Sequence, residues 1–225
     1  KERGSEEENT TLPLEGVKVL DFMWALAGPG ATRTLADLGA TVIRVESSSR
    51  LDVIRTIRPF IDSDESPEKS ALFHNTNAGK NLISLDLTKP EGKAVAMDLV
   101  RWCDVVTESF SPKAMKAFGL DYESLLAVNS DVIMLSTCLF GQTGPLSMFA
   151  GYGNLAAAIA GFYTITGWPN REPAGPFGAY TDYIAPRYNA AAVIAALDHR
   201  DRSGEGQRID LAQAESAMHF LTPAI

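Results

Sequence analysis

The chain has 225 residues, is 45% hydrophobic and carries a formal net charge of −8. A chain of this length and composition buries enough apolar surface for one globular domain or slightly more, so it is not a disordered tail. The acidic balance, without a cluster of Lys and Arg, argues against a nucleic-acid partner, because neutralising phosphates needs concentrated positive charge.

The two cysteines, Cys103 and Cys138, lie in apolar runs that predict buried strands, so neither resembles a metal ligand or half of a disulfide framework. We therefore predict no metal site and a cytoplasmic location. No apolar run approaches the roughly 18 residues of a membrane span, and no signal peptide is recognised. Residues 1–11 hold no apolar side chain and are predicted to be a polar linker or tag that precedes a folded domain over residues 12–225.

The first elements predict a parallel sheet. Two short β-branched runs, residues 17–22 and 40–46, flank a helical stretch over residues 31–38. This order is typical of a βαβ unit, whose two strands are parallel. Over residues 52–70 the pattern gives way to Pro, Ser and charge, which indicates a long irregular connection of the kind that often lines a site.

The alternation of strands and helices continues along the chain. Further elements are strands over residues 83–87, 104–107 and 132–137, a helix over residues 88–102, two short helices within residues 112–128, and a buried helix over residues 151–163. Thr88 is the expected N-cap of the second helix, with Pro90 in its first turn. The pattern predicts an α/β class: a doubly wound, mostly parallel, Rossmann-like sheet with flanking helices.

The most informative segment spans residues 175–214. It places Asp182 in a short polar turn, after a Pro- and Gly-rich loop over residues 166–181 and before an Ala-rich helix over residues 186–199. An extended apolar alternation follows over residues 207–211. A lone carboxylate in this place can stand at the lip of a pocket. Asp is equally common as a helix N-cap, and the residue pattern leaves both interpretations open.

A glycine motif between the first strand and helix imitates a dinucleotide-binding fingerprint. Gly28 and Gly30 have the required spacing, and Glu46 ends the next strand, but Arg33 stands where the third glycine belongs. Nicotinamide binding by a dehydrogenase is therefore a weak interpretation. The alternatives are a simple tight turn and a helix N-terminus that accepts a phosphate.

Other polar residues gather where predicted strands end. Four arginines lie near the end of the second strand and in the loop beyond it: Arg44, Arg50, Arg55 and Arg58. They are either phosphate ligands or solvated charges. Glu108 closes a later strand and is either a ligand contact or a turn acceptor. The three histidines lie far apart and none adjoins a G-x-S-x-G motif, so no serine or cysteine triad is indicated.

Beyond these single features, a series of ordered motifs resembles the family III CoA-transferases, the group that includes formyl-CoA, carnitine and bile-acid CoA-transferases. The matching motifs are LEGVKVLDF at residues 14–22, AGP at 27–29, LADLGA at 35–40, VIRVE at 42–46, NAGK at 77–80, ISLDL at 83–87, ESFSP at 108–112, FGL at 118–120, FGQTGP at 140–145, AAL at 195–197, Arg200, and SGEGQ at 203–207. So many motifs in one order make the resemblance specific.

The resemblance implies a transferase that moves CoA between carboxylic acids, with acyl-CoA and a carboxylic acid as substrates and coenzyme A as the carrier. The family's nucleophile falls on Asp182, which would pass through an aspartyl anhydride and an aspartyl-CoA thioester. The CoA-binding positions fall on Ala25, Leu26, Arg44, Asn77, Lys80, Ser109 and Phe110.

Members of this family are longer and fold as interlocked ring dimers, so the resemblance implies a large-domain fragment with a homodimer or tandem-domain partner. The alternative is a non-catalytic half of a tandem protein that binds CoA or forms the dimer, in which Asp182 only caps its helix.

Two pairs of residues depart from the family pattern. Ala150-Gly151 is followed by Tyr152-Gly153, where the family's racemase branch has a His-Asp pair. Pro186-Arg187 replaces the small residues common after the family's aspartate, which predicts an altered acyl pocket.

Overall fold

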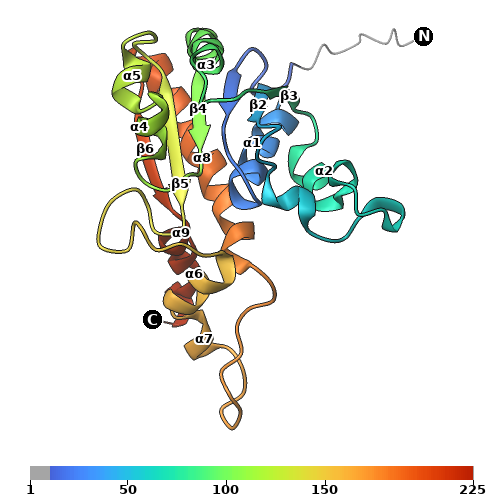
Figure 1. Cartoon of the computed structure of the whole chain (residues 1–225). Helices are drawn as coiled ribbons and strands as arrows, with labels where there is room; N and C mark the ends of the chain where they lie inside the picture. Colours follow the sequence, from blue (N-terminus) through green and yellow to red (C-terminus); the bar gives the residue numbers. More distant parts are fainter. Residues whose placement is uncertain (1–10, 225) are drawn as a thin grey trace, which may run out of the picture.

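The computed structural model of the chain describes residues 11–224. Apart from Thr11, the predicted linker over residues 1–11 lies outside the described residues. Within the described part, six parallel strands form one sheet in the order β3-β2-β1-β4-β5-β6, with helices on both faces (Figure 1). The doubly wound α/β fold predicted from the sequence is confirmed.

The strands are β1 (Lys18–Asp21), β2 (Thr41–Glu46), β3 (Asn81–Ser84), β4 (Val105–Glu108), β5 (Ile133–Cys138) and β6 (Arg208–Ala212). The α-helices are α1 (Ala27–Asp37), α2 (Ala71–Asn77), α3 (Pro90–Trp102), α4 (Ala114–Phe118), α5 (Tyr122–Leu126), α6 (Gly153–Ile159), α7 (Phe162–Ile165), α8 (Tyr180–Ser203) and α9 (Gln213–Met218). Short 3₁₀ helices occupy Val53–Thr56, Ile61–Ser63, Pro67–Lys69 and His219–Ala224. None of the helices within residues 11–224 is both long enough and apolar enough to cross a membrane.

Several element boundaries differ from the prediction. The N-cap of α3 is Lys89, and the Thr88 hydroxyl instead donates to Asp86 Oδ1 at 2.6 Å. The helix predicted over residues 151–163 is divided into α6 and α7 by Gly161, whose φ of 98° is open to glycine but strained for other residues. Cys103 follows α3 and does not lie in a strand.

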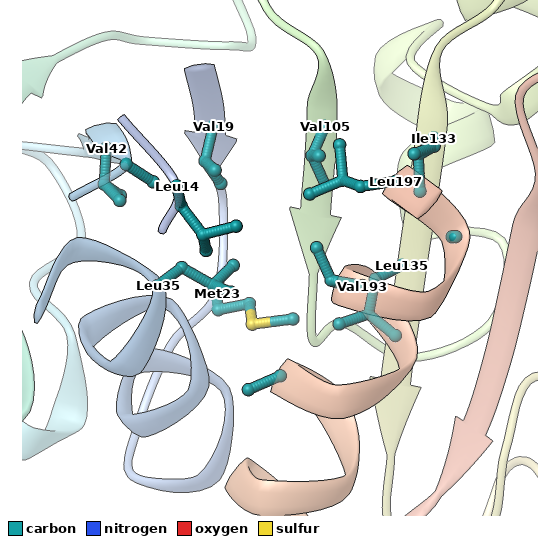
Figure 2. Packing of buried hydrophobic residues seen from close by; sticks show 13 residues of the cluster. Leu14, Val19, Met23, Leu35, Val42, Val105, Ile133, Leu135, Val193 and Leu197 are labelled. Carbon is teal, nitrogen blue, oxygen red and sulfur yellow. The ribbon is translucent and has the colours of Figure 1, made fainter. Parts of the chain in front are cut away.

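Alternate residues of the central strands pack into two separate apolar layers. Val19 and Val105 face α1 and α8, whereas Leu20 and Val106 face α3, α4 and α5. Figure 2 shows the first layer, in which side chains from β1, β4 and β5 meet α1 and α8. Because a parallel strand buried on both faces needs apolar residues throughout, these strands appear in the sequence as continuous apolar runs.

The longest helix, α8, begins six residues earlier than the sequence predicted. Residues 180–185 therefore extend the Ala-rich helix, and Asp182 lies inside its first turn. Pro186 lies inside the helix, and since proline has no N–H, the Asp182 carbonyl lacks the usual helical donor four residues later. Pro186 also packs closely on α1, because a Cβ added to Gly30 would lie 3.2 Å from its Cγ.

A buried ion-pair network fixes the loop between β1 and α1. The fully buried Arg44 places Nη2 2.5 Å from Asp52 Oδ2, places Nε 3.2 Å from Glu46 Oε1, and donates from Nη1 to the Met23 carbonyl at 2.7 Å. The Asp52 carboxylate in turn accepts the Ala25 N–H at 3.0 and 3.1 Å. Ala25 has a φ of 62°, a left-handed conformation that costs a non-glycine residue about 1–3 kcal/mol. The network therefore holds a strained loop in place.

The other arginines of the predicted cluster do not share one site. The exposed Arg50 lies over the Trp24 ring, with its Cζ 5.7 Å from the ring centroid. Arg55 is buried, lies 2.6 Å from Glu46 and stacks 3.5 Å from the Phe73 ring centroid. Arg58 pairs with Glu65 on the surface. Neither the phosphate-site nor the solvated-charge interpretation describes Arg44 and Arg55, because carboxylates from neighbouring elements already neutralise them.

We predict that Arg44→Met destabilises the protein by about 3–5 kcal/mol, because two carboxylates would lose their buried cation. The free energy of unfolding in urea at pH 7 measures this. Arg58→Met is the matched control, since it breaks an exposed pair and is expected to change stability by at most about 1 kcal/mol. Equal effects of the two substitutions would contradict a supporting role for the Arg44 network.

Candidate functional site

A cavity of about 220 Å³ opens beyond the carboxyl ends of β1, β4 and β5. Its walls come from the loop after β1 (Trp24, Ala25, Leu26), the start of α1 (Ala27, Gly28), the loop after β4 (Ser109, Phe110, Ser111), the end of β5 and the residues that follow it (Thr137, Cys138, Leu139), a long loop (Ser147 to Tyr152), Asp182 and Gln213. The order of the strands reverses between β1 and β4, because β2 and β3 follow on one side of β1 and β5 and β6 follow on the far side of β4. Ligands of doubly wound sheets bind at this switch point.

Asp182 forms part of the cavity wall. Asp182 is only 8% exposed, and its Oδ2 accepts a hydrogen bond from the Gly153 N–H at 3.3 Å. Its Oδ1 accepts no hydrogen bond from any residue between 11 and 224. Burial raises the pKa of the Asp182 carboxyl to about 6, against the lowering effect of the Gly153 N–H. The carboxylate is thus largely desolvated but still ionised at neutral pH.

Gly153, at the start of α6, makes this arrangement possible. A Cβ at this position would lie 2.7 Å from the Asp182 nitrogen and 2.8 Å from its Cγ, distances that real Cβ atoms do not show. The Thr181 hydroxyl lies 3.3 Å from the Gly153 carbonyl oxygen and 3.4 Å from Gln213 Oε1, so α6, α8 and α9 meet here. Sequence analysis missed Gly153 and Gln213, and the glycine at a helix start was the one available signal.

The helix-cap interpretation of Asp182 is wrong. The N-cap of α8 is Ala179, three residues earlier, and no side chain caps the helix there. Asp182 occupies the first turn, where the helix dipole favours a carboxylate, but its oxygen bonds to α6 and not to its own helix. The side chain is therefore placed by packing between two helices.

Four of the seven predicted CoA-binding positions line the cavity. They are Ala25, Leu26, Ser109 and Phe110. The Ser109 hydroxyl accepts the Trp24 N–H at 2.8 Å, and the Phe110 ring packs edge-on against the Trp24 ring at 6.0 Å. These contacts join the loops that follow β1 and β4 into one wall.

The other three positions, Arg44, Asn77 and Lys80, lie behind this wall. The fully buried Lys80 ammonium donates to Asp21 Oδ2 at 3.1 Å, to the Pro29 carbonyl at 2.9 Å and to Asn77 Oδ1 at 2.9 Å. Burial lowers the pKa of Lys80 to about 8, although the Asp21 carboxylate favours the charged form. In this conformation these side chains hold α1 against the sheet and do not face the cavity.

Glu108 accepts a backbone hydrogen bond in the turn that follows β4. Its buried carboxylate accepts the Phe110 N–H at 2.8 Å, and burial raises its pKa to about 7. It lines a neighbouring cavity with Arg208, separate from the one that Asp182 lines. Over residues 11–224 no group of three or more His, Cys, Asp and Glu side chains is arranged to hold a metal ion.

Comparison with known proteins decides the class. The family model described as CoA-transferase family III matches residues 14–225. The chain belongs to this family. Gly28 and Gly30 lie in the first turn of α1, and the family assignment replaces the dehydrogenase interpretation of these glycines.

Individual relatives of this CoA-transferase chain agree with the assignment. It is 44% identical over 206 residues to the succinate–glutarate CoA-transferase of Agrobacterium fabrum, covering 91% of this chain and 52% of the relative. It is 37% identical over 209 residues to the succinyl-CoA:glutarate CoA-transferase of Homo sapiens, covering 92% and 47%. A solved CAIB/BAIF family protein from Brucella suis superposes with a TM-score of 0.88 at 38% identity, covering 95% and 56%. The chain spans about half the length of the curated relatives it matches.

We predict that Asp182→Asn stabilises the protein at neutral pH. A carboxyl whose pKa rises from 3.8 to about 6 on folding keeps its proton in the folded state between those pH values, so stability falls as pH rises from about 4 to 6 and stays low above. The cost of ionisation is on the order of 3 kcal/mol, and asparagine removes it while keeping an acceptor for Gly153.

Urea unfolding at pH 8 and pH 4 measures this effect, which is expected at pH 8 and reduced at pH 4. Asp201→Asn, an exposed position of the same helix, is the control and is expected to change little at either pH. The absence of a gain at pH 8 would show that Asp182 is well solvated.

Proposed function

We propose that this chain is the CoA-binding, nucleophile-bearing domain of a transferase that moves CoA between two carboxylic acids, and that it forms the N-terminal half of a longer protein. The observation that carries the proposal is the buried Asp182 carboxylate on the wall of a cavity at the switch point of the sheet. The shared family and the names of the relatives support the reaction class.

In the first half-reaction, the Asp182 carboxylate attacks the thioester carbonyl carbon of the donor acyl-CoA. The carbon–sulfur bond breaks, its electron pair leaves with the CoA thiolate, and a mixed anhydride remains on Asp182. The thiolate then attacks the aspartyl carbonyl of the anhydride. The donor acid leaves as a carboxylate, and Asp182 carries CoA as a thioester.

The second half-reaction runs the same bonds in reverse. The acceptor carboxylate attacks the aspartyl thioester and releases the thiolate, which then attacks the acceptor's carbonyl in the new anhydride. The products are the acceptor acyl-CoA and the free Asp182 carboxylate. Carboxylates and thiolates exchange without net proton transfer, so the site needs no general acid or base.

Three features of the site suit this chemistry. Desolvation makes the Asp182 carboxylate a stronger nucleophile than a hydrated one, while a pKa of about 6 leaves it ionised at neutral pH. Apolar walls from Leu139 and Phe149 exclude water, which would otherwise hydrolyse the activated intermediates. The Gly153 N–H fixes the direction of the carboxylate.

We assign the predicted CoA-binding residues two roles. Ala25, Leu26, Ser109 and Phe110 line the cavity and are placed to contact CoA directly. Arg44, Asn77 and Lys80 do not contact CoA in this assignment but hold the strained loop and the start of α1 in place. The free N–H groups at the start of α1 favour an anionic ligand.

The proposal also includes a surface of exposed apolar side chains that contacts another protein segment. Large apolar side chains are exposed around α7 and the following loop, with Trp168 71% and Phe177 fully exposed, and near the chain end, with Phe220 55% exposed. Figure 1 shows the loop over residues 166–179, in orange, extending away from the sheet beyond α7. Relatives from Chloroflexus aurantiacus are named as alpha and beta subunits. We propose that the missing half, or a second subunit as in a homodimer, covers this surface.

We predict that Asp182→Asn in the full-length transferase lowers CoA transfer by at least roughly a thousandfold, because an amide cannot form the anhydride. Trapping locates the intermediate: the enzyme is incubated with acyl-CoA, hydroxylamine is added, and the peptide containing Asp182 is examined by mass spectrometry for a hydroxamate. Asp201→Asn is the control and should retain transfer. Near-normal transfer by Asp182→Asn would leave only a non-catalytic CoA-binding domain, whereas a hydroxamate on Glu108 would assign the nucleophile to that residue instead.

We also predict that the 225-residue chain associates in solution, because exposed aromatic side chains favour burial. Light scattering at increasing protein concentration should show a dimer or larger species. The double variant Trp168→Ser, Phe177→Ser should associate less, whereas Asn170→Ser, in the same loop, should not differ from the parent chain. A stable monomer at all concentrations would exclude this surface as an interface between copies of the chain.

A further inference from the structure

A second cavity of about 290 Å³ reaches Asp182 from the side of α1 and α2. It shares only Asp182 and Leu26 with the first cavity. Its volume lies near the lower end of ligand pockets, roughly 300–1,000 Å³, and is sufficient for a small molecule. The Asp182 carboxylate therefore stands between a cavity assigned to CoA and a second, separate space.

Two guanidinium groups line the second cavity. Arg187, on α8, donates from Nη1 to the Thr34 hydroxyl at 3.2 Å and forms no ion pair with any carboxylate of residues 11–224. Arg33, on α1, donates to the Asn75 carbonyl and lies 3.4 Å from Asp37, which also lines the cavity. Arg187 is exposed and has no carboxylate partner among residues 11–224, so its remaining N–H donors are free to bind an anion that enters the cavity.

Arg187 and Asp182 line the same cavity, although they leave α8 in different directions. Five residues along a helix correspond to a rise of about 7.5 Å and a rotation of about 140° around the axis. An acid that reacts through one carboxylate at Asp182 would therefore bring a second carboxylate, a few carbons away, toward Arg187. A monocarboxylic acid would leave the cation without a partner.

We propose that the second cavity binds the acid substrate and that Arg187, assisted by Arg33, binds the distal carboxylate of a short dicarboxylic acid. This inference rests on the proposed function, since it assigns the reacting carboxylate to Asp182. Arginine suits the role because its planar fork of donors matches a carboxylate in two parallel hydrogen bonds. Arg187 is thus a specificity-determining residue that selects dicarboxylic over monocarboxylic acids.

Substitutions at Arg187 can distinguish the effect of its positive charge from the effect of its hydrogen bond to Thr34. Arg187→Gln removes the charge but keeps an N–H donor for Thr34, and Arg187→Lys keeps the charge without the fork. Arg33→Gln tests the assisting cation. Arg202→Gln is the matched control, because Arg202 lies on the same helix, far from the cavity, in an exposed pair with Asp198.

The first measurement is steady-state transfer by the full-length enzyme, with butyryl-CoA as donor and either succinate or valerate as acceptor. Arg187→Gln is expected to raise the KM for succinate roughly 10- to 100-fold with little change in kcat, and to leave valerate within about twofold. Arg187→Lys should fall between Arg187→Gln and the unmodified enzyme. An equal loss with both acids, or no loss with succinate, overturns the inference even though the transferase activity stands.

The second measurement is binding of succinate alone, by calorimetry, without acyl-CoA. Binding that is lost in Arg187→Gln and kept in Arg202→Gln supports the assignment. Equal binding by Arg187→Gln and the unmodified protein, or no binding to the unmodified protein, overturns it. If no acid accepts CoA at all, the proposed function fails, and this binding result still decides whether the cavity takes a dicarboxylate.

Discussion

The architecture of the site depends on one buried charge cluster, the contacts of Arg44 with Asp52, Glu46 and the Met23 carbonyl. Through Asp52 this cluster holds Ala25 in a left-handed conformation, and so sets the path of the chain from β1 into α1. Leu26, the next residue, contributes to both cavities beside the nucleophile. A buried ion pair contributes little net stability compared with apolar packing, but it gives a loop one defined conformation. Binding geometry and fold are therefore coupled at this point.

The second constraint is the desolvation of Asp182. A carboxylate with one N–H partner, a raised pKa and little solvent reduces the stability of the folded protein, and such costs are common where a residue is kept for reactivity. Gly153 is needed for the same reason, since any side chain there would push α6 away from α8. Desolvation and the close contact of two helix ends thus combine to place a reactive carboxylate between two cavities.

The two cavities divide the proposed chemistry. The one at the switch point of the sheet is lined by loops, aromatic rings and small residues, and is the one proposed to contact CoA. The one between α1, α2 and α8 carries the guanidinium groups of Arg33 and Arg187, which suit a small anion. The exposed aromatic side chains beyond α7 form the surface proposed to contact further protein. In the proposed mechanism this domain supplies the nucleophile, and further protein surface would complete the exclusion of water.

Periodicity in the amino-acid sequence was enough to predict the doubly wound sheet, because fully buried strands and the helices between them leave local patterns of apolar residues. Motif order was enough to indicate the family and to single out Asp182. Contacts between elements could not be predicted: Gly153 contacts Asp182 from 29 residues away, and Arg44 bonds to the Met23 carbonyl from 21 residues away. The start of α8 was misplaced at Pro186 because packing against α6 and α1 extends the helix past a residue that usually begins one. Local propensity records what a segment prefers, whereas burial, ion pairing and cavity shape arise only when segments pack together.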